Sequence, residues 1–238
     1  MSSVNTESDT GGRPENGPTA GRDPVPEAVD WAISGVVGLI GLFVTVFGAW
    51  LFVAVDRQVI SDAVRAEGVE LNGITPSEAV TAGVPFVEWS AVGIVVTGLL
   101  LALGAGLFIR RRRATRRRVD REGGTTATFW AATVYGAAVT VVTSFVPVSA
   151  AVGGGVAASL RDSRDATRVG AAAGVFPTAL SAPFVLLLSV GFLVGADAIG
   201  QLGGGVFLAG ISLFGLLFAG VFNAVLGAAG GWIADRWL

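Results

Sequence analysis

The chain contains no histidine, no cysteine and no lysine, and its only methionine is Met1. Without histidine and cysteine it cannot form His-ligated haem, thiolate zinc or iron–sulfur sites, and it has no Cys nucleophile, His general base or disulfide. Without lysine it cannot form a Schiff base. Most familiar enzyme chemistry is therefore excluded, and the sequence predicts no catalytic residue, no cofactor and no metal site.

Formal charge is also scarce. Of the 238 residues, 52% are hydrophobic and 14% are charged, whereas soluble domains carry about 25% charged residues. The uncharged runs cover residues 31–55, 89–109, 123–160, 169–196 and 198–234. Each run is long enough for the ~20 residues that a helix needs to cross ~30 Å of hydrocarbon, where backbone amides must bond within their own segment. The sequence therefore predicts an all-α, polytopic integral membrane helical bundle in the cell membrane, with about six membrane segments, five long and one short or re-entrant.

The first half divides into a tail and a helix pair. Residues 1–28 are rich in Gly, Pro, Ser, Thr and acidic residues, which predicts a disordered N-terminal tail. Residues 29–109 are expected to form a transmembrane helix pair, whose two spans are the first two uncharged runs. The external loop between them, residues 56–88, is acidic.

Within that loop, Thr75, Pro76 and Glu78 have the cap, proline and reciprocal-acid spacing of a helix start. A short surface helix is predicted from this point to Gly83. It would serve as a plain connector on the membrane face or as a lid that captures a solute.

Arginines follow the second span directly. An Arg at mid-bilayer costs roughly 2.5 to 3.5 kcal/mol, so four in a row end the span, and the positive-inside rule places them in the cytoplasm. An Arg-rich cytoplasmic loop is therefore predicted at residues 110–125. The expected topology-determining residues are Arg110, Arg111, Arg112, Arg113, Arg116, Arg117, Arg118 and Arg121. Besides the lipid bilayer, anionic lipid headgroups are a candidate partner at this loop; no nucleic acid is expected, and a protein partner is left open.

Residues 126–238 are expected to form a Gly/Ala-rich transmembrane domain of about four segments. The uncharged run 123–160 is too long for one crossing and short for two. Pro147 resolves it into a span over about 127–145 and a short segment over 148–160 that crosses or re-enters.

The connection 161–168 carries three arginines, and the run after it contains Pro177 and Pro183, which should bend it. The last segment covers about 203–233. With six crossings, 14 of the 16 arginines and both termini lie in the cytoplasm; if segment 148–160 does not cross, only ten arginines do.

Glycine occurs 35 times, often at a spacing of four. Small residues at this spacing let helices approach closely in lipid. The expected helix-packing positions are Gly154, Gly170, Gly174, Gly191, Gly195, Gly227 and Gly231. Alternatively, the triplets 153–155 and 203–205 are unwound points beside a solute site near the midplane.

The stretch from Pro147 to Phe176 contains a proline, a Gly-Gly pair at Gly154 and Gly155, a charged connection, and then Arg168-Val169-Gly170-Ala171. In this it resembles a group of small haloarchaeal multi-pass membrane proteins that share a domain with no assigned function. The resemblance covers about the last 110 residues and implies no catalytic residue.

No ionisable residue lies inside a predicted span, so the usual mark of an ion path is missing. Asp197 is expected in a loop, and Asn223 is expected to form an interhelical hydrogen bond. Tyr135, Thr140 and Thr143 form either a polar stripe or bonds to their own helix backbone.

Three functions remain. The first is a non-enzymatic membrane protein with a structural or partner-association role, supported by a membrane interior without charge. The second is a small-solute transporter or pore that uses broken Gly/Pro helices. The third, an intramembrane enzyme, has few acid–base groups to draw on. A dry interior packed through glycines favours the first, whereas a polar cavity between the last four segments favours the second.

Overall fold

The computed structural model describes residues 25–66, 73–161 and 165–237, which form seven α-helices. Within these ranges four helices are long and apolar enough to cross a membrane: α1 (Glu27–Ala54), α3 (Pro76–Glu122), α6 (Ala166–Ala198) and α7 (Leu202–Trp237). The shorter helices are α2 (Arg57–Ala66), α4 (Phe129–Val142) and α5 (Ser149–Ser159). The all-α prediction is confirmed. Most of the predicted tail lies outside the described residues, and α1 begins inside it at Glu27.

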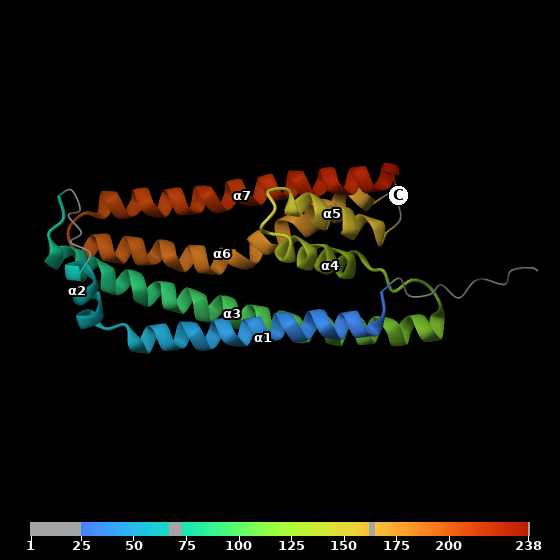
Figure 1. Cartoon of the computed structure of the whole chain (residues 1–238), viewed down its shortest axis with the longest axis horizontal. Helices are drawn as coiled ribbons and strands as arrows, with labels where there is room; N and C mark the ends of the chain where they lie inside the picture. Colours follow the sequence, from blue (N-terminus) through green and yellow to red (C-terminus); the bar gives the residue numbers. More distant parts are fainter. Residues whose placement is uncertain (1–24, 67–72, 162–164, 238) are drawn as a thin grey trace, which may run out of the picture.

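The four long helices lie side by side in the order α1, α3, α6, α7 (Figure 1). Helices α4 and α5 pack on each other and on α6, and α5 also packs on α7. They lie beside one half of the long helices, at the end of the molecule where α1 begins and α7 ends (Figure 1). Helix α2 packs on α3 at the opposite end.

Helix α3 is one continuous helix of 47 residues, or about 70 Å. Its start is the predicted capping box, in which Thr75 and Glu78 bond reciprocally. The backbone and then the side-chain hydrogen bond from Thr75 lower the pKa of the Glu78 carboxyl, which precedes the uncharged run. The prediction of a short helix ending at Gly83 is wrong, because neither Gly83 nor Pro85 stops the helix.

The predicted arginine loop at residues 110–125 is also wrong over most of its length. Helix α3 continues to Glu122 and is capped by Gly123. The φ of Gly123 is +75°, a conformation that glycine adopts without strain. The arginines 110–121 therefore form a helical extension of α3 beyond the apolar span. We call this extension the arginine segment.

Helices α4 and α5 are too short to cross a bilayer. They have 14 and 11 residues, or about 21 and 16 Å, against the ~30 Å of the hydrocarbon layer. The Arg161 guanidinium donates from Nη1 to the carbonyl oxygen of Ala127 at 3.0 Å, so the start of α4 and the end of α5 lie together. The predicted full span at 127–145 is therefore corrected: α4 and α5 form a hairpin that lies beside only one half of the long helices (Figure 1), which we call the half-depth hairpin.

This hairpin changes the count of candidate membrane-spanning segments. Four helices are long enough to cross, and the prediction of five long segments and one short one is corrected. Arg161 lies beside Ala127, just before α4, and α4 and α5 lie at the same end of the bundle as the end of α3 (Figure 1).

Helix α6 continues through Pro177 and Pro183, and the ribbon bends along its length (Figure 1). Asp197 lies in its last turn rather than in a loop, and its carbonyl oxygen accepts a hydrogen bond from the Gly200 amide at 3.0 Å. Gly200 has a φ of +68°, which permits the tight turn into α7.

Glycine and alanine fill the contacts among α5, α6 and α7. A Cβ atom on Gly154 of α5 would collide with the backbone of Gly227 on α7, and one on Gly170 of α6 would collide with the same carbonyl. Ala157 of α5 and Ala173 of α6 are fully buried in a cluster with Ala132 of α4. The close approach of three backbones leaves no space for larger side chains.

Candidate functional site

A charged cluster lies inside the helical bundle near the start of α1. Asp30, in the first turn of α1, is fully buried. Arg112 and Arg116 lie on α3, four residues apart and therefore on one helix face. Tyr135 on α4 is also buried. We call these four residues the Asp30 cluster; it joins α1, α3 and the half-depth hairpin.

Both arginines bind the same carboxylate. Arg112 donates from Nε to both oxygens of Asp30 at 3.1 Å, and Arg116 donates to Oδ2 from Nε at 3.1 Å and from Nη2 at 2.7 Å. The Tyr135 hydroxyl donates to Asp30 Oδ1. Each carboxylate oxygen therefore accepts more than one hydrogen bond, and these charge-assisted bonds are stronger than neutral ones.

The arginines also bind backbone carbonyls near the ends of the helices. Arg112 donates from Nη1 to the Thr126 oxygen, and Arg116 donates from Nη2 to the Val25 oxygen at 2.9 Å. The Arg112 guanidinium lies 5.7 Å from the centre of the Tyr135 ring. The cluster thus fixes the entry into α1 and the connection before α4 relative to α3.

Burial makes this cluster sensitive to the loss of a partner. Two guanidinium groups face one carboxylate, and moving charges out of water costs several kcal/mol per ion unless the hydrogen bonds are well made. Ionisable groups at membrane depth are expensive and often functional. Asp30 lies one residue before the first uncharged run and the two arginines follow the second, so the cluster is buried within the protein at the ends of the predicted spans.

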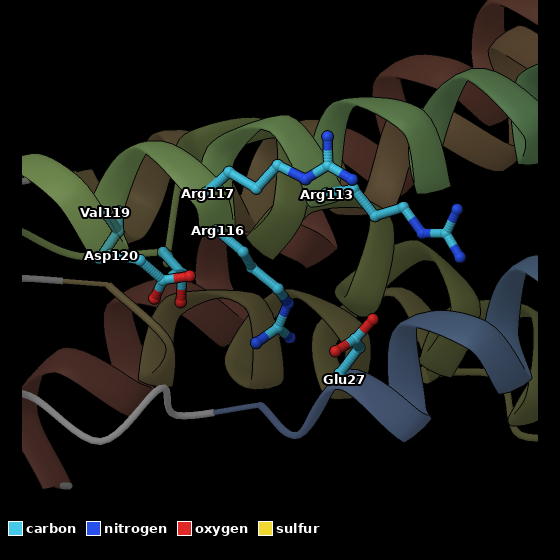
Figure 2. A pocket seen from close by; sticks show the side chains of 7 residues that line it. Glu27, Arg113, Arg116, Arg117, Val119 and Asp120 are labelled. Atoms are coloured by element: carbon cyan, nitrogen blue, oxygen red, sulfur yellow. The ribbon is translucent and has the colours of Figure 1, made fainter.

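A pocket of about 640 Å³ opens beside the Asp30 cluster, between the arginine segment and the start of α1 (Figure 2). Figure 2 shows the Arg116 side chain extending from α3 toward the start of α1, where Glu27 lies. The lining residues are Glu27, Arg113, Arg116, Arg117, Val119, Asp120 and Thr126. We call this the basic pocket, because three guanidinium groups face two carboxylates in its wall.

The predicted topology-determining arginines therefore differ in their surroundings. Arg112 is buried and Arg116 half-buried, whereas the exposed members are Arg110, Arg111, Arg113, Arg117, Arg118 and Arg121. Arg113 lies over the Trp31 ring at 4.3 Å, and Arg118 pairs with Glu122 at 2.9 Å.

The seven glycines expected at packing positions all lie against a neighbouring helix. Gly154, Gly170 and Gly174 face α7, and Gly227 and Gly231 face α6. In the C-terminal half of α6, Gly191 faces Phe86 and Trp89 of α3, and Gly195 faces Ala82 of α3. The alternative of unwound triplets is wrong, since 153–155 and 203–205 are helical.

The predicted polar positions have separate partners. Asn223 donates to the Thr178 hydroxyl oxygen at 3.1 Å, which confirms the expected bond between α6 and α7. Thr140 and Thr143 donate to carbonyls of their own helix. Among the described residues no three acidic, histidine or cysteine side chains gather as metal ligands.

Sequence reasoning missed the Asp30 cluster. The available signals were an acidic residue directly before an apolar run, and two arginines four apart in a stretch free of Gly and Pro. The single tyrosine, Tyr135, was a third signal, but nothing in the sequence indicated that its partner is Asp30 on α1.

Residues 130–236 match the model of a family of unknown function (DUF5518). The match spans α4 to α7 and confirms that the C-terminal half holds a shared domain of unknown function. No curated protein and no solved structure shows significant similarity to the chain.

Proposed function

We propose that the protein is a non-enzymatic multi-pass membrane protein with a structural or partner-association role in the bilayer. Four long helices cross the membrane, and the hairpin of α4 and α5 enters and returns on one side. The proposal also places the arginine segment, the basic pocket and both chain ends in the cytoplasm, because cytoplasmic ends carry an excess of arginine.

The observation that carries this proposal is the backbone contact among α5, α6 and α7. Gly227 faces both Gly154 and Gly170, and a Cβ atom on Gly230 would collide with the backbone of Ala151. A solute path needs polar groups around open space, whereas these helices meet through glycine and alanine. This region is built to hold its helices together.

The exposed surface supports the same proposal. Large apolar side chains line the outside of α1 and α7, among them Phe43, Val53, Phe214 and Leu217. Surfaces of this kind are stable in lipid or against other membrane helices, and they are unfavourable in water.

The transporter alternative has lost the features on which it depended. The glycine triplets are helical, and Pro177 and Pro183 lie within one continuous helix. The enzyme alternative has little more support. Asp30 is fully buried, and Arg112, Arg116 and Tyr135 already bind its oxygens, so a substrate has no access to the carboxylate.

Reconstitution of the full chain into liposomes tests the proposal. We expect loaded small solutes to leave these vesicles at the rate of protein-free vesicles. In a second experiment, two differently labelled copies of the protein, or one copy and a candidate partner, are diluted with lipid, and the energy transfer between the two labels is measured. A structural or partner-association role predicts that the energy transfer persists on dilution. Saturable, protein-dependent solute release that is lost in Gly153→Leu would overturn the proposal in favour of a transporter.

A further inference from the structure

We propose that the basic pocket binds a phosphate group, as carried by an anionic lipid headgroup of the adjoining leaflet. The inference rests on the proposed placement of the arginine segment at the cytoplasmic membrane surface. Its support comes from the arrangement of the guanidinium groups, the balance of charge and the depth of the pocket in the bilayer.

Three arginines of α3 line the pocket. Arg113 lies three residues before Arg116 and four residues before Arg117, so it is a helix-surface neighbour of each. Figure 2 shows the Arg116 side chain extending toward the start of α1 and the Arg113 and Arg117 side chains extending along α3. A guanidinium presents a planar set of N–H donors that matches two phosphate oxygens at once. Arg116 is held in place by Asp30 and the Val25 carbonyl, so less conformational freedom is lost when a ligand binds.

Arginines outnumber carboxylates among the described residues of the pocket wall. Among the described residues, the pocket and the adjacent Asp30 cluster hold four arginines and three carboxylates: Arg112, Arg113, Arg116, Arg117, Glu27, Asp30 and Asp120. A phosphodiester carries one negative charge, which attracts it to the pocket arginines.

The pocket lies at the depth of lipid headgroups. Trp31 begins the uncharged run of α1 and packs under the Arg113 guanidinium, and tryptophan is enriched at the membrane–water interface. The first turn of α1 borders the pocket through Glu27, and its N-cap residue Pro26 provides no side-chain cap. The positive end of this helix adds a favourable field for an anion.

Binding is tested on the purified full chain in a neutral detergent by native mass spectrometry and thermal shift. The probes are phosphatidylglycerol, phosphatidylcholine and inorganic phosphate. The variant Arg113→Gln/Arg117→Gln removes two exposed pocket arginines and leaves the Asp30 cluster intact. The matched control, Arg111→Gln/Arg118→Gln, removes the same charge from α3 outside the pocket. We expect the pocket variant to weaken phosphatidylglycerol binding at least about tenfold and the control to retain it, since each lost charged hydrogen bond changes affinity by roughly this factor.

The outcomes separate the sources of the phosphate. Tight binding of phosphatidylglycerol with weak binding of inorganic phosphate supports a lipid ligand, whereas pocket-dependent binding of inorganic phosphate supports a soluble one. Equal losses in both variants, or no loss in the pocket variant, would overturn the site and leave only diffuse attraction to the arginine segment. These measurements need no bilayer orientation and no assembly, so they can fail or succeed independently of the proposed function.

Discussion

Arg112 Nε lies 3.1 Å from both carboxylate oxygens of Asp30, although the two residues are 82 positions apart in the chain. The contact connects the first turn of α1 with the arginine segment beyond the apolar part of α3. Through Tyr135 it also reaches the hairpin at the start of the matched family domain. One carboxylate therefore ties the N-terminal helix pair to the C-terminal half.

The Asp30→Asn substitution tests how much of the fold depends on this tie. It leaves two guanidinium groups without their counter-charge, and breaking a buried ion pair costs about 3–5 kcal/mol. We expect a clear fall in the melting temperature of the purified protein in detergent. Glu27→Gln, one turn earlier and exposed, should change stability by less than about 0.5 kcal/mol. Equal melting of the two variants would show that the cluster does not hold the helices together.

Tyr135→Phe removes only the hydroxyl of the cluster. The ring keeps its contact with Phe108, while Asp30 loses one donor. A hydrogen bond to a charged group contributes about 1.5–3 kcal/mol, so we expect an intermediate loss of thermal stability, smaller than that of Asp30→Asn. Thr143→Val is the control, because that hydroxyl bonds a carbonyl of its own helix. A Tyr135→Phe variant as stable as the control contradicts the assigned hydrogen bond.

The sequence predicts best those parts of the fold in which the lipid environment requires apolar residues. The apolar cores of the long helices follow from the absence of charge over about 20 residues, and α1 and α7 lie where the runs place them. The Thr75 cap and the Asn223 bond were also predictable, because each depends on a local pattern or on a single polar group in an apolar helix.

The parts that it does not predict depend on where helices end and which helices meet. The arginines end the apolar span, but nothing in that stretch breaks a helix, so α3 continues to Glu122. Residues 123–160 contain no charge, yet α4 stops at Val142 because the chain turns before Pro147. The pairing of Asp30 with Arg112 needs the register between α1 and α3, which no spacing in the chain encodes.

Gly154→Ala tests the close contact between α5 and α7. The added methyl group meets the Gly227 backbone, which cannot move aside as a flexible side chain would. Overpacking costs about 1–3 kcal/mol, more than the 0.5–1 kcal/mol, roughly, that alanine gains over glycine within a helix. We expect a lower melting temperature. The matched control is Gly104→Ala on α3, because its Cβ atom would meet nothing within 4 Å. This control should leave the melting temperature unchanged or raise it slightly. A higher melting temperature for Gly154→Ala than for Gly104→Ala would contradict the close contact between α5 and α7.

The depth of the hairpin is tested by introducing single cysteines into a chain that has none. Phe145 lies in the turn between α4 and α5, which a half-depth hairpin places inside the hydrocarbon. A thiol there has no water to support its thiolate, so we expect Phe145→Cys to resist a membrane-impermeant maleimide from either side until detergent is added.

Two exposed positions calibrate this labelling experiment. Ala198→Cys, at the end of α6, should react in intact cells, and Thr125→Cys, just beyond α3, should react only when the reagent reaches the cytoplasmic side. Reaction of Phe145→Cys in intact cells, at the rate of Ala198→Cys, would show that α4 crosses the membrane. Reaction of Thr125→Cys from outside would instead reverse the proposed orientation while leaving the hairpin unaffected, because the hairpin returns to whichever side it enters from.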